Sequence, residues 1–226
     1  MPHRQGVHER RAPLCDPARL LAFLAGLVVV AGLALPAPAR AATLVFFGDS
    51  LTAGLGLDDP LAESFPGLIR ARLEAGVPGW RVVNAGVSGE TAADGLHRVD
   101  WVLRQPVDVF VLELGAHDGL RGLPLDALTA NLRAILARVR ERQPRAILVL
   151  AGMRLPPSMG QDYTEGFAAA YPRVARETGA VLIPFLLEGV GGVPALNQAD
   201  GIHPNAEGHR RVAETVWRVV RPLLHN

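Results

Sequence analysis

The stretch TLVFFGDSL, residues 43–51, joins an apolar run to a turn of small and polar residues. A nearly continuous apolar run, here residues 43–47, is typical of a strand that is buried on both faces of a parallel sheet. Four further runs have this texture, at residues 81–84, 108–114, 146–151 and 180–184. The sequence therefore predicts five strands, and Ser50 stands in the turn after the first.

Stretches with helical spacing separate the predicted strands. One apolar stripe recurs at positions 125, 128, 132, 135, 136 and 139. Further helices are expected at residues 63–74, 91–103, 163–178 and 205–220, and Asn205 is placed to cap the last of them. Strands that alternate with helices predict an α/β fold, a three-layer sandwich in which helices cover both faces of a five-stranded parallel sheet.

The first 41 residues differ in composition from the rest of the chain. Arginines at positions 4, 10, 11 and 19 precede an apolar run at 20–35, and small residues follow at 36–42. This layout is typical of a secretory signal peptide, and the run is shorter than the roughly 20 residues of a membrane span. We expect residues 1–41 to be a cleaved leader and residues 42–226 to be one domain, periplasmic or secreted. An uncleaved anchor is the alternative, and the Arg10-Arg11 pair is a weak indication of twin-arginine export.

Charge and residue usage exclude several classes of protein. Residues 42–226 hold 18 basic and 20 acidic residues, a formal charge of −2, so we expect no nucleic-acid partner. The one cysteine, Cys15, lies in the predicted leader, which leaves the domain without a disulfide or a thiolate nucleophile. All 23 basic residues are arginine. The absence of lysine excludes a Walker phosphate loop, a Schiff-base lysine and a Ser–Lys dyad.

Two turns far apart in the sequence carry a serine, a histidine and a carboxylate. Ser50 follows the first predicted strand, and DGIHP stands at residues 200–204. A serine hydroxyl becomes nucleophilic when a base takes its proton and a third group orients that base. Because functional groups gather at the carboxyl ends of parallel strands, we expect Ser50 as nucleophile, His203 as base and Asp200 as the orienting acid.

These residues resemble the SGNH, or GDSL, hydrolase family, and within it the secreted bacterial thioesterase, arylesterase and lysophospholipase group. GDSL at 48–51, VSGET at 87–91, ELGAHDGLRG at 113–122 and DGIHP at 200–204 match the four family blocks in order. The resemblance implies a flavodoxin-like sheet, hydrolysis of a small acyl ester or thioester through an acyl-enzyme, and no metal or other cofactor. It also implies that the backbone amides of Ser50 and Gly89 bind the oxyanion, and that the mature protein is a monomer without a stable membrane anchor.

One block departs from the family pattern. The family has an asparagine whose side-chain amide donates to the oxyanion, and this chain has His117 at that position. A neutral imidazole keeps one N–H, so we expect His117 to be the third oxyanion donor. The apolar segments that follow, 119–123 and 153–157, are expected to line an acyl pocket through Leu120, Leu123, Leu155 and Pro156.

Other interpretations of these residues remain open. Ser88 is a rival nucleophile in GVSGE, 86–90, but the hydrolase elbow requires glycine where Glu90 stands. His203 and His209 match no common metal-ligand spacing, and His209 is expected on the exposed face of the last helix. The alternative functions are a carbohydrate deacetylase, which the 5% aromatic content disfavours, and a catalytically weak acyl- or lipid-binding relative that lost an oxyanion donor at His117.

Two groups of charged residues have simple structural interpretations. Asp49 and Asp118 are expected to fasten turns, because aspartate readily accepts hydrogen bonds from nearby backbone N–H groups. The arginines at positions 138, 140, 142 and 145 are expected to form a solvated helix end that the helix dipole favours.

Overall fold

A computed structural model describes residues 40–224 and contains one five-stranded parallel sheet. The strands are β1 (Ala42–Gly48), β2 (Trp80–Gly86), β3 (Val109–Glu113), β4 (Ile147–Ala151) and β5 (Val181–Ile183). They are ordered β2-β1-β3-β4-β5, with every neighbouring pair parallel. The predicted strands and the flavodoxin-like class are confirmed. The predicted leader lies outside the described residues, apart from residues 40 and 41.

Burial separates the central strands from the edge strands. β3 is buried along its whole length, and β1 and β4 are buried except at their first residues. The edge strand β2 has no fully buried residue, and β5 has one. Burial on both faces, which the sequence predicted for all five strands, is therefore wrong for β2 and β5, because each has a neighbouring strand on one side only.

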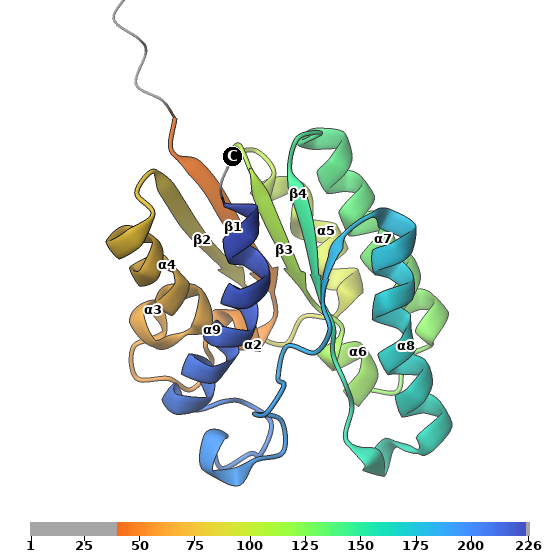
Figure 1. Ribbon diagram of the computed structural model, residues 1–226. Helices are drawn as coiled ribbons and strands as arrows, with labels where there is room; N and C mark the ends of the chain where they lie inside the picture. The colour runs from red at the N-terminus through yellow and green to blue at the C-terminus, as the bar shows by residue number, and fades with distance from the viewer. Residues whose placement is uncertain (1–39, 225–226) are drawn as a thin grey trace, which may run out of the picture. The chain divides into compact units, whose positions relative to one another are not determined.

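Helices cover both faces of the sheet (Figure 1). On one face α4 (Phe65–Gly76) packs against α9 (Ala206–Val220). On the other, α7 (Leu125–Arg142) lies between α5 (Ala92–Val102) and α8 (Gln161–Thr178). All five predicted helices are present, and the Asn205 side chain caps α9 by accepting the Gly208 N–H. Among residues 40–224 no helix is both long and apolar enough to cross a bilayer.

Several short helices connect these elements. Three are α-helical, α2 (Ser50–Ala53), α3 (Pro60–Glu63) and α6 (Ala116–Leu120), and three are 3₁₀ turns, η1 (Pro157–Met159), η2 (Pro194–Leu196) and η3 (Arg221–Leu223). The sequence predicted none of them, because three to five residues cannot display a helical period. α2 begins at Ser50 and α6 contains His117, so two of the short helices carry predicted site residues.

His209 corrects one expectation. It lies on the buried face of α9 with 1% of its surface exposed, stacked beside the Phe65 ring at 6.3 Å between centroids. Its Nδ1 accepts the Phe65 N–H at 3.2 Å, and burial lowers its pKa to about 4. His209 is therefore a neutral residue that joins α9 to the start of α4, and its placement on an exposed face was wrong.

Candidate active site

The turn after β1 places Ser50 at the carboxyl edge of the sheet. Asp49 caps α2, because its Oδ1 accepts the Leu51 N–H at 3.0 Å. Gly48 has no room for a side chain, since a Cβ there would meet Thr52 and Glu113. The turn is thus held between two neighbouring strands, with Gly48 paired to Gly86 of β2 and to Glu113 of β3. Ser50 itself is 3% exposed.

The loop before α9 presents the histidine. The Asp200 Oδ1 accepts the backbone N–H groups of Ile202 at 2.9 Å and His203 at 3.0 Å, which folds residues 200–203 into a tight turn. Gly201 has a φ of +69°, a conformation that favours glycine. Gln198 joins this loop to the end of α2, because its Nε2 donates to the Leu55 carbonyl at 2.7 Å and its N–H to the His203 carbonyl at 2.8 Å.

The two turns bring the serine, histidine and aspartate together. The Ser50 Oγ lies 2.8 Å from the His203 Nε2, and the His203 Nδ1 lies 2.6 Å from the Asp200 Oδ2. The hydrogen bond from His203 and those from the two backbone N–H groups lower the pKa of Asp200 to about 2. Asp200 is therefore ionised at neutral pH and holds the His203 ring with its Nε2 directed at Ser50.

The predicted oxyanion donors follow three adjacent strands. Ser50 follows β1, Gly89 follows β2 and His117 follows β3. Within residues 40–224, the backbone N–H groups of Ser50 and Gly89 have no hydrogen-bond acceptor. Gly89 has a φ of +89°, and its carbonyl accepts from the Arg121 guanidinium at 3.3 Å. Both amides are thus available to a ligand.

His117 is half-buried, and its ring makes no hydrogen bond to residues 40–224. Burial lowers its pKa, and the nearby charges of Arg121 and His203 lower it further against the opposing effect of Asp118. His117 is therefore neutral at pH 7 and above, with one ring N–H. Asp118 accepts a backbone hydrogen bond as expected. Its carboxylate accepts the Ala92 N–H at 2.8 Å and so joins α6 to the start of α5.

A cavity of about 500 Å³ opens beside Ser50 and His203. Its wall is mainly apolar and includes Leu120, Leu155 and Pro156, as the sequence predicted, with Met153 and Pro157 from the expected segment 153–157. His117, the expected oxyanion donor, also borders it. The sequence did not indicate five further lining residues, Phe185, Leu187, Gly191, Gly192 and Ile202. Leu123 does not line the cavity, and its carbonyl instead accepts the Tyr163 hydroxyl at 2.7 Å. The volume lies in the usual range of small-molecule sites.

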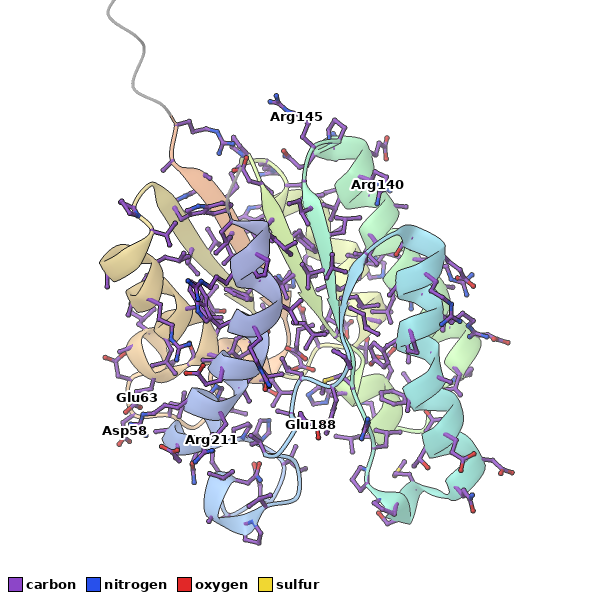
Figure 2. All side chains as sticks on the ribbon, viewed as in Figure 1. Asp58, Glu63, Arg140, Arg145, Glu188 and Arg211 are labelled. Atoms are coloured by element: carbon purple, nitrogen blue, oxygen red, sulfur yellow. The ribbon has the colours of Figure 1, made fainter. Side chains whose placement is uncertain are left out.

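One cation, Arg154, lines the cavity with its guanidinium over the Phe185 ring, 4.8 Å from the ring centroid, whereas several other charged residues lie apart from the cavity. Figure 2 shows Arg140 and Arg145 at the edge of the sheet where the strands begin, while Glu188 lies toward the edge where they end. Arg140 donates to the Thr178 carbonyl at 2.7 Å, which ties α7 to the end of α8. Ser88 is exposed, and its hydroxyl is not hydrogen-bonded to a histidine of the described chain.

Sequence reasoning gave no role to an ion pair beside the Ser50 turn. The Arg98 Nε lies 2.6 Å from both Glu90 carboxylate oxygens, and its Nη2 donates to the Gly48 carbonyl at 3.1 Å. The guanidinium also lies over the Phe47 ring, 3.9 Å from its centroid. Arg98 therefore joins the end of β1 to the loop after β2. Arg98 stands in the interior of the helix predicted at 91–103, five residues before its end, and no local pattern marks it.

Comparisons with known proteins identify the family of this chain. A model of the GDSL-like Lipase/Acylhydrolase family matches residues 46–211. The chain is 41% identical over 187 residues to Esterase TesA of Pseudomonas aeruginosa, covering 82% of this chain and 91% of TesA. It is 36% identical over 189 residues to Thioesterase 1/protease 1/lysophospholipase L1 of Escherichia coli K12, covering 83% and 88% of the two chains.

A solved structure has the same fold. The psychrotrophic esterase EstA from Pseudoalteromonas sp., in a crystal structure inhibited by monoethylphosphonate, is 29% identical and has a TM-score of 0.75, covering 81% of this chain and 99% of EstA. The family match includes the turn at 48–51 and the loop at 200–204, so the resemblance inferred from the four sequence blocks is confirmed. The chain belongs to the GDSL-like lipase/acylhydrolase family and is an SGNH-type esterase or thioesterase.

Proposed function

We propose that this enzyme cleaves carboxylic esters or acyl thioesters through an acyl-enzyme on Ser50, with His203 as the base and Asp200 as the acid that orients it. The observation that carries the proposal is the unbroken hydrogen-bonded series from Asp200 to His203 to Ser50, which ends at an apolar cavity. A hydroxyl 2.8 Å from an imidazole nitrogen is within reach for proton transfer.

The reaction follows from these contacts. The His203 Nε2 takes the Ser50 proton while Oγ attacks the acyl carbonyl, and Asp200 stabilises the imidazolium that forms. His203 then protonates the departing alcohol or thiol, which leaves the acyl group on Ser50. Water, deprotonated by His203, attacks this acyl-enzyme, and collapse of the second tetrahedral intermediate releases the acid and restores the Ser50 hydroxyl.

The oxyanion of each tetrahedral intermediate requires donors that are already in place. We assign this role to the backbone N–H groups of Ser50 and Gly89 and to the ring N–H of His117. The support is that both amides lack a protein acceptor in residues 40–224 and that the neutral ring of His117 borders the same cavity as Ser50. Preorganised donors of this kind supply a large part of the rate in acyl transfer.

The cavity and the relatives point to the class of substrate. Its apolar wall suits an acyl chain, and the two relatives are named as an esterase and as a thioesterase and lysophospholipase. We propose small acyl esters and thioesters as substrates, no nucleic-acid partner, and a monomeric enzyme. We further propose that residues 1–41 direct export and are removed, leaving residues 42–226 as the mature periplasmic or secreted domain without an anchor.

The test of the nucleophile uses two serine variants. Ser50→Ala should abolish hydrolysis of a short nitrophenyl ester and block covalent labelling by an organophosphonate, detected by mass spectrometry. Ser88→Ala is the matched control, because Ser88 stands in a similar glycine-rich turn but is exposed and has no hydrogen bond to His203. It should retain wild-type hydrolysis and labelling. Hydrolysis that survives in Ser50→Ala but not in Ser88→Ala contradicts the assignment.

A further inference from the structure

Two carboxyl groups are buried together beneath Ser50. Asp49 immediately precedes Ser50 and Glu113 ends β3, and both side chains are 0% exposed. The Glu113 Oε2 accepts the Thr52 hydroxyl at 2.7 Å and the Asp49 N–H at 3.2 Å. Glu113, at the end of the central strand β3, therefore holds both Asp49 and Thr52, the residues on either side of Ser50 and Leu51.

Each carboxyl of this pair has one oxygen that the rest of the protein leaves unbonded. Within residues 40–224 the Asp49 Oδ2 and the Glu113 Oε1 are buried without a hydrogen-bond partner. Two buried carboxylates side by side lack solvation and repel each other. Burial and the neighbouring Asp49 charge raise the pKa of Glu113 well above its usual range, and burial raises the pKa of Asp49 to about 6.

The surrounding ionisable groups do not provide a partner for these oxygens. Those that face the pair are His203, Glu90, Arg98 and Tyr171. The Arg98 guanidinium is bonded to Glu90 and to the Gly48 carbonyl. The Tyr171 hydroxyl donates to the Leu114 carbonyl at 3.1 Å, and His203 is bonded to Ser50 and Asp200. None of these groups is therefore left to donate to the two unbonded carboxyl oxygens.

We propose that Asp49 and Glu113 share a single proton at neutral pH, and that Glu113 thereby acts as a positioning residue that clamps the turn bearing Ser50 against the end of β3. The O–H of one carboxyl donates to the other, so the pair carries one negative charge and attracts rather than repels. The positioning role rests on Ser50 being the nucleophile, as proposed above. The shared proton does not depend on that assignment.

The proton is tested by infrared spectroscopy of the purified enzyme at pH 7.5. The wild type should show the C=O stretch of a protonated carboxylic acid, shifted in D₂O, and Glu113→Gln should lose it. Glu74→Gln is the control, because Glu74 is an exposed glutamate on α4, and it should keep the band. A wild type without this band overturns the single-proton pair, whatever the activity of Ser50→Ala.

The positioning role is tested by kinetics on one nitrophenyl ester. Glu113→Gln keeps an acceptor for Thr52 and Asp49 and offers an amide N–H to the Asp49 carboxylate, whereas Glu113→Leu offers neither. We expect Glu113→Leu to lower kcat by roughly ten- to a hundredfold with little change in KM, because small displacements of a reacting group have effects of this size. Glu113→Gln should retain at least tenfold more kcat than Glu113→Leu.

Thr52→Val provides a second variant should Glu113→Leu fail to fold. It removes one of the two donors to Glu113 and should lower kcat by about threefold or more, again without raising KM. Circular dichroism verifies the fold of each variant. Wild-type kcat in Glu113→Leu, or in a folded Thr52→Val where Glu113→Leu does not fold, overturns the positioning role. So does a Glu113→Gln variant that is as slow as Glu113→Leu.

Discussion

Replacement of His117 tests whether an imidazole serves where the family has an asparagine amide. His117 borders the same cavity as Ser50 and His203, and its ring is free of hydrogen bonds to residues 40–224. Its lowered pKa keeps the ring neutral at pH 8, where one N–H remains to donate. His117→Ala removes this donor and leaves the amides of Ser50 and Gly89 in place.

The expected size of the effect follows from the exposure of the site. Removal of one oxyanion donor costs about a hundred- to a thousandfold in kcat where the donor is well shielded from water. His117 is only half-buried, so water can replace part of the lost bond, and the expected loss widens to roughly ten- to a thousandfold. KM should change little, because the bond strengthens mainly in the transition state.

The assay is steady-state hydrolysis of a short nitrophenyl ester at pH 8 by wild type, His117→Ala and His117→Asn. His117→Asn restores the family residue and should give a kcat at least comparable to that of the wild type. His97→Ala is the control for loss of a histidine, because His97 is exposed on α5. Equal kcat values for His117→Ala and the wild type would refute the reasoning and leave the two backbone amides as the oxyanion donors.

Two further predictions concern stability and the acyl pocket. Unfolded histidine binds a proton below pH ~6.5, but folded His209 does so only below about 4. Acidification from pH 7 to 4 should therefore remove about 3 kcal/mol from the free energy of unfolding through this residue. Urea unfolding at both pH values should show a smaller loss for His209→Gln than for the wild type. Leu120→Trp should narrow the cavity and lower kcat/KM for octanoyl more than for acetyl nitrophenyl esters, and equal losses for both would contradict the assigned pocket wall.

The sequence predicted the sheet because its strands are encoded locally. Apolar runs and helical stripes located all five strands and the five long helices. The error at His209 had a local signal as well. His209 stands three, four, seven and eleven residues before the buried Val212, Ala213, Val216 and Val220, and therefore falls on the apolar stripe of α9. His209 was assigned to the exposed face because its side chain is polar, even though its position in the helix indicated burial. A neutral histidine with one backbone partner is readily buried.

The site was predictable where short motifs carry it. The turn at 48–51 and the loop at 200–204 each contain the aspartate, Asp49 or Asp200, whose hydrogen bonds fold them. A motif of four or five residues is therefore enough to predict the local conformation. The cavity wall was predictable only in part. Phe185, Leu187 and Gly191 reach it along a loop of irregular path after β5, and such a path depends on tertiary packing that no periodicity records.

The residues of the site are held in place in two different ways: some by the pairing of the strands, and His203 by a loop. Ser50, Gly89 and His117 follow β1, β2 and β3, so the pairing of three adjacent strands sets their relative positions. His203 has no such support, because the long loop after β5 delivers it. Its position depends on the Asp200 turn and on Gln198, whose side chain spans from the Leu55 carbonyl to the Pro204 carbonyl. The proposed nucleophile and oxyanion donors are thus fixed by the sheet, while the base is held outside the sheet by the side-chain and backbone hydrogen bonds of its own loop.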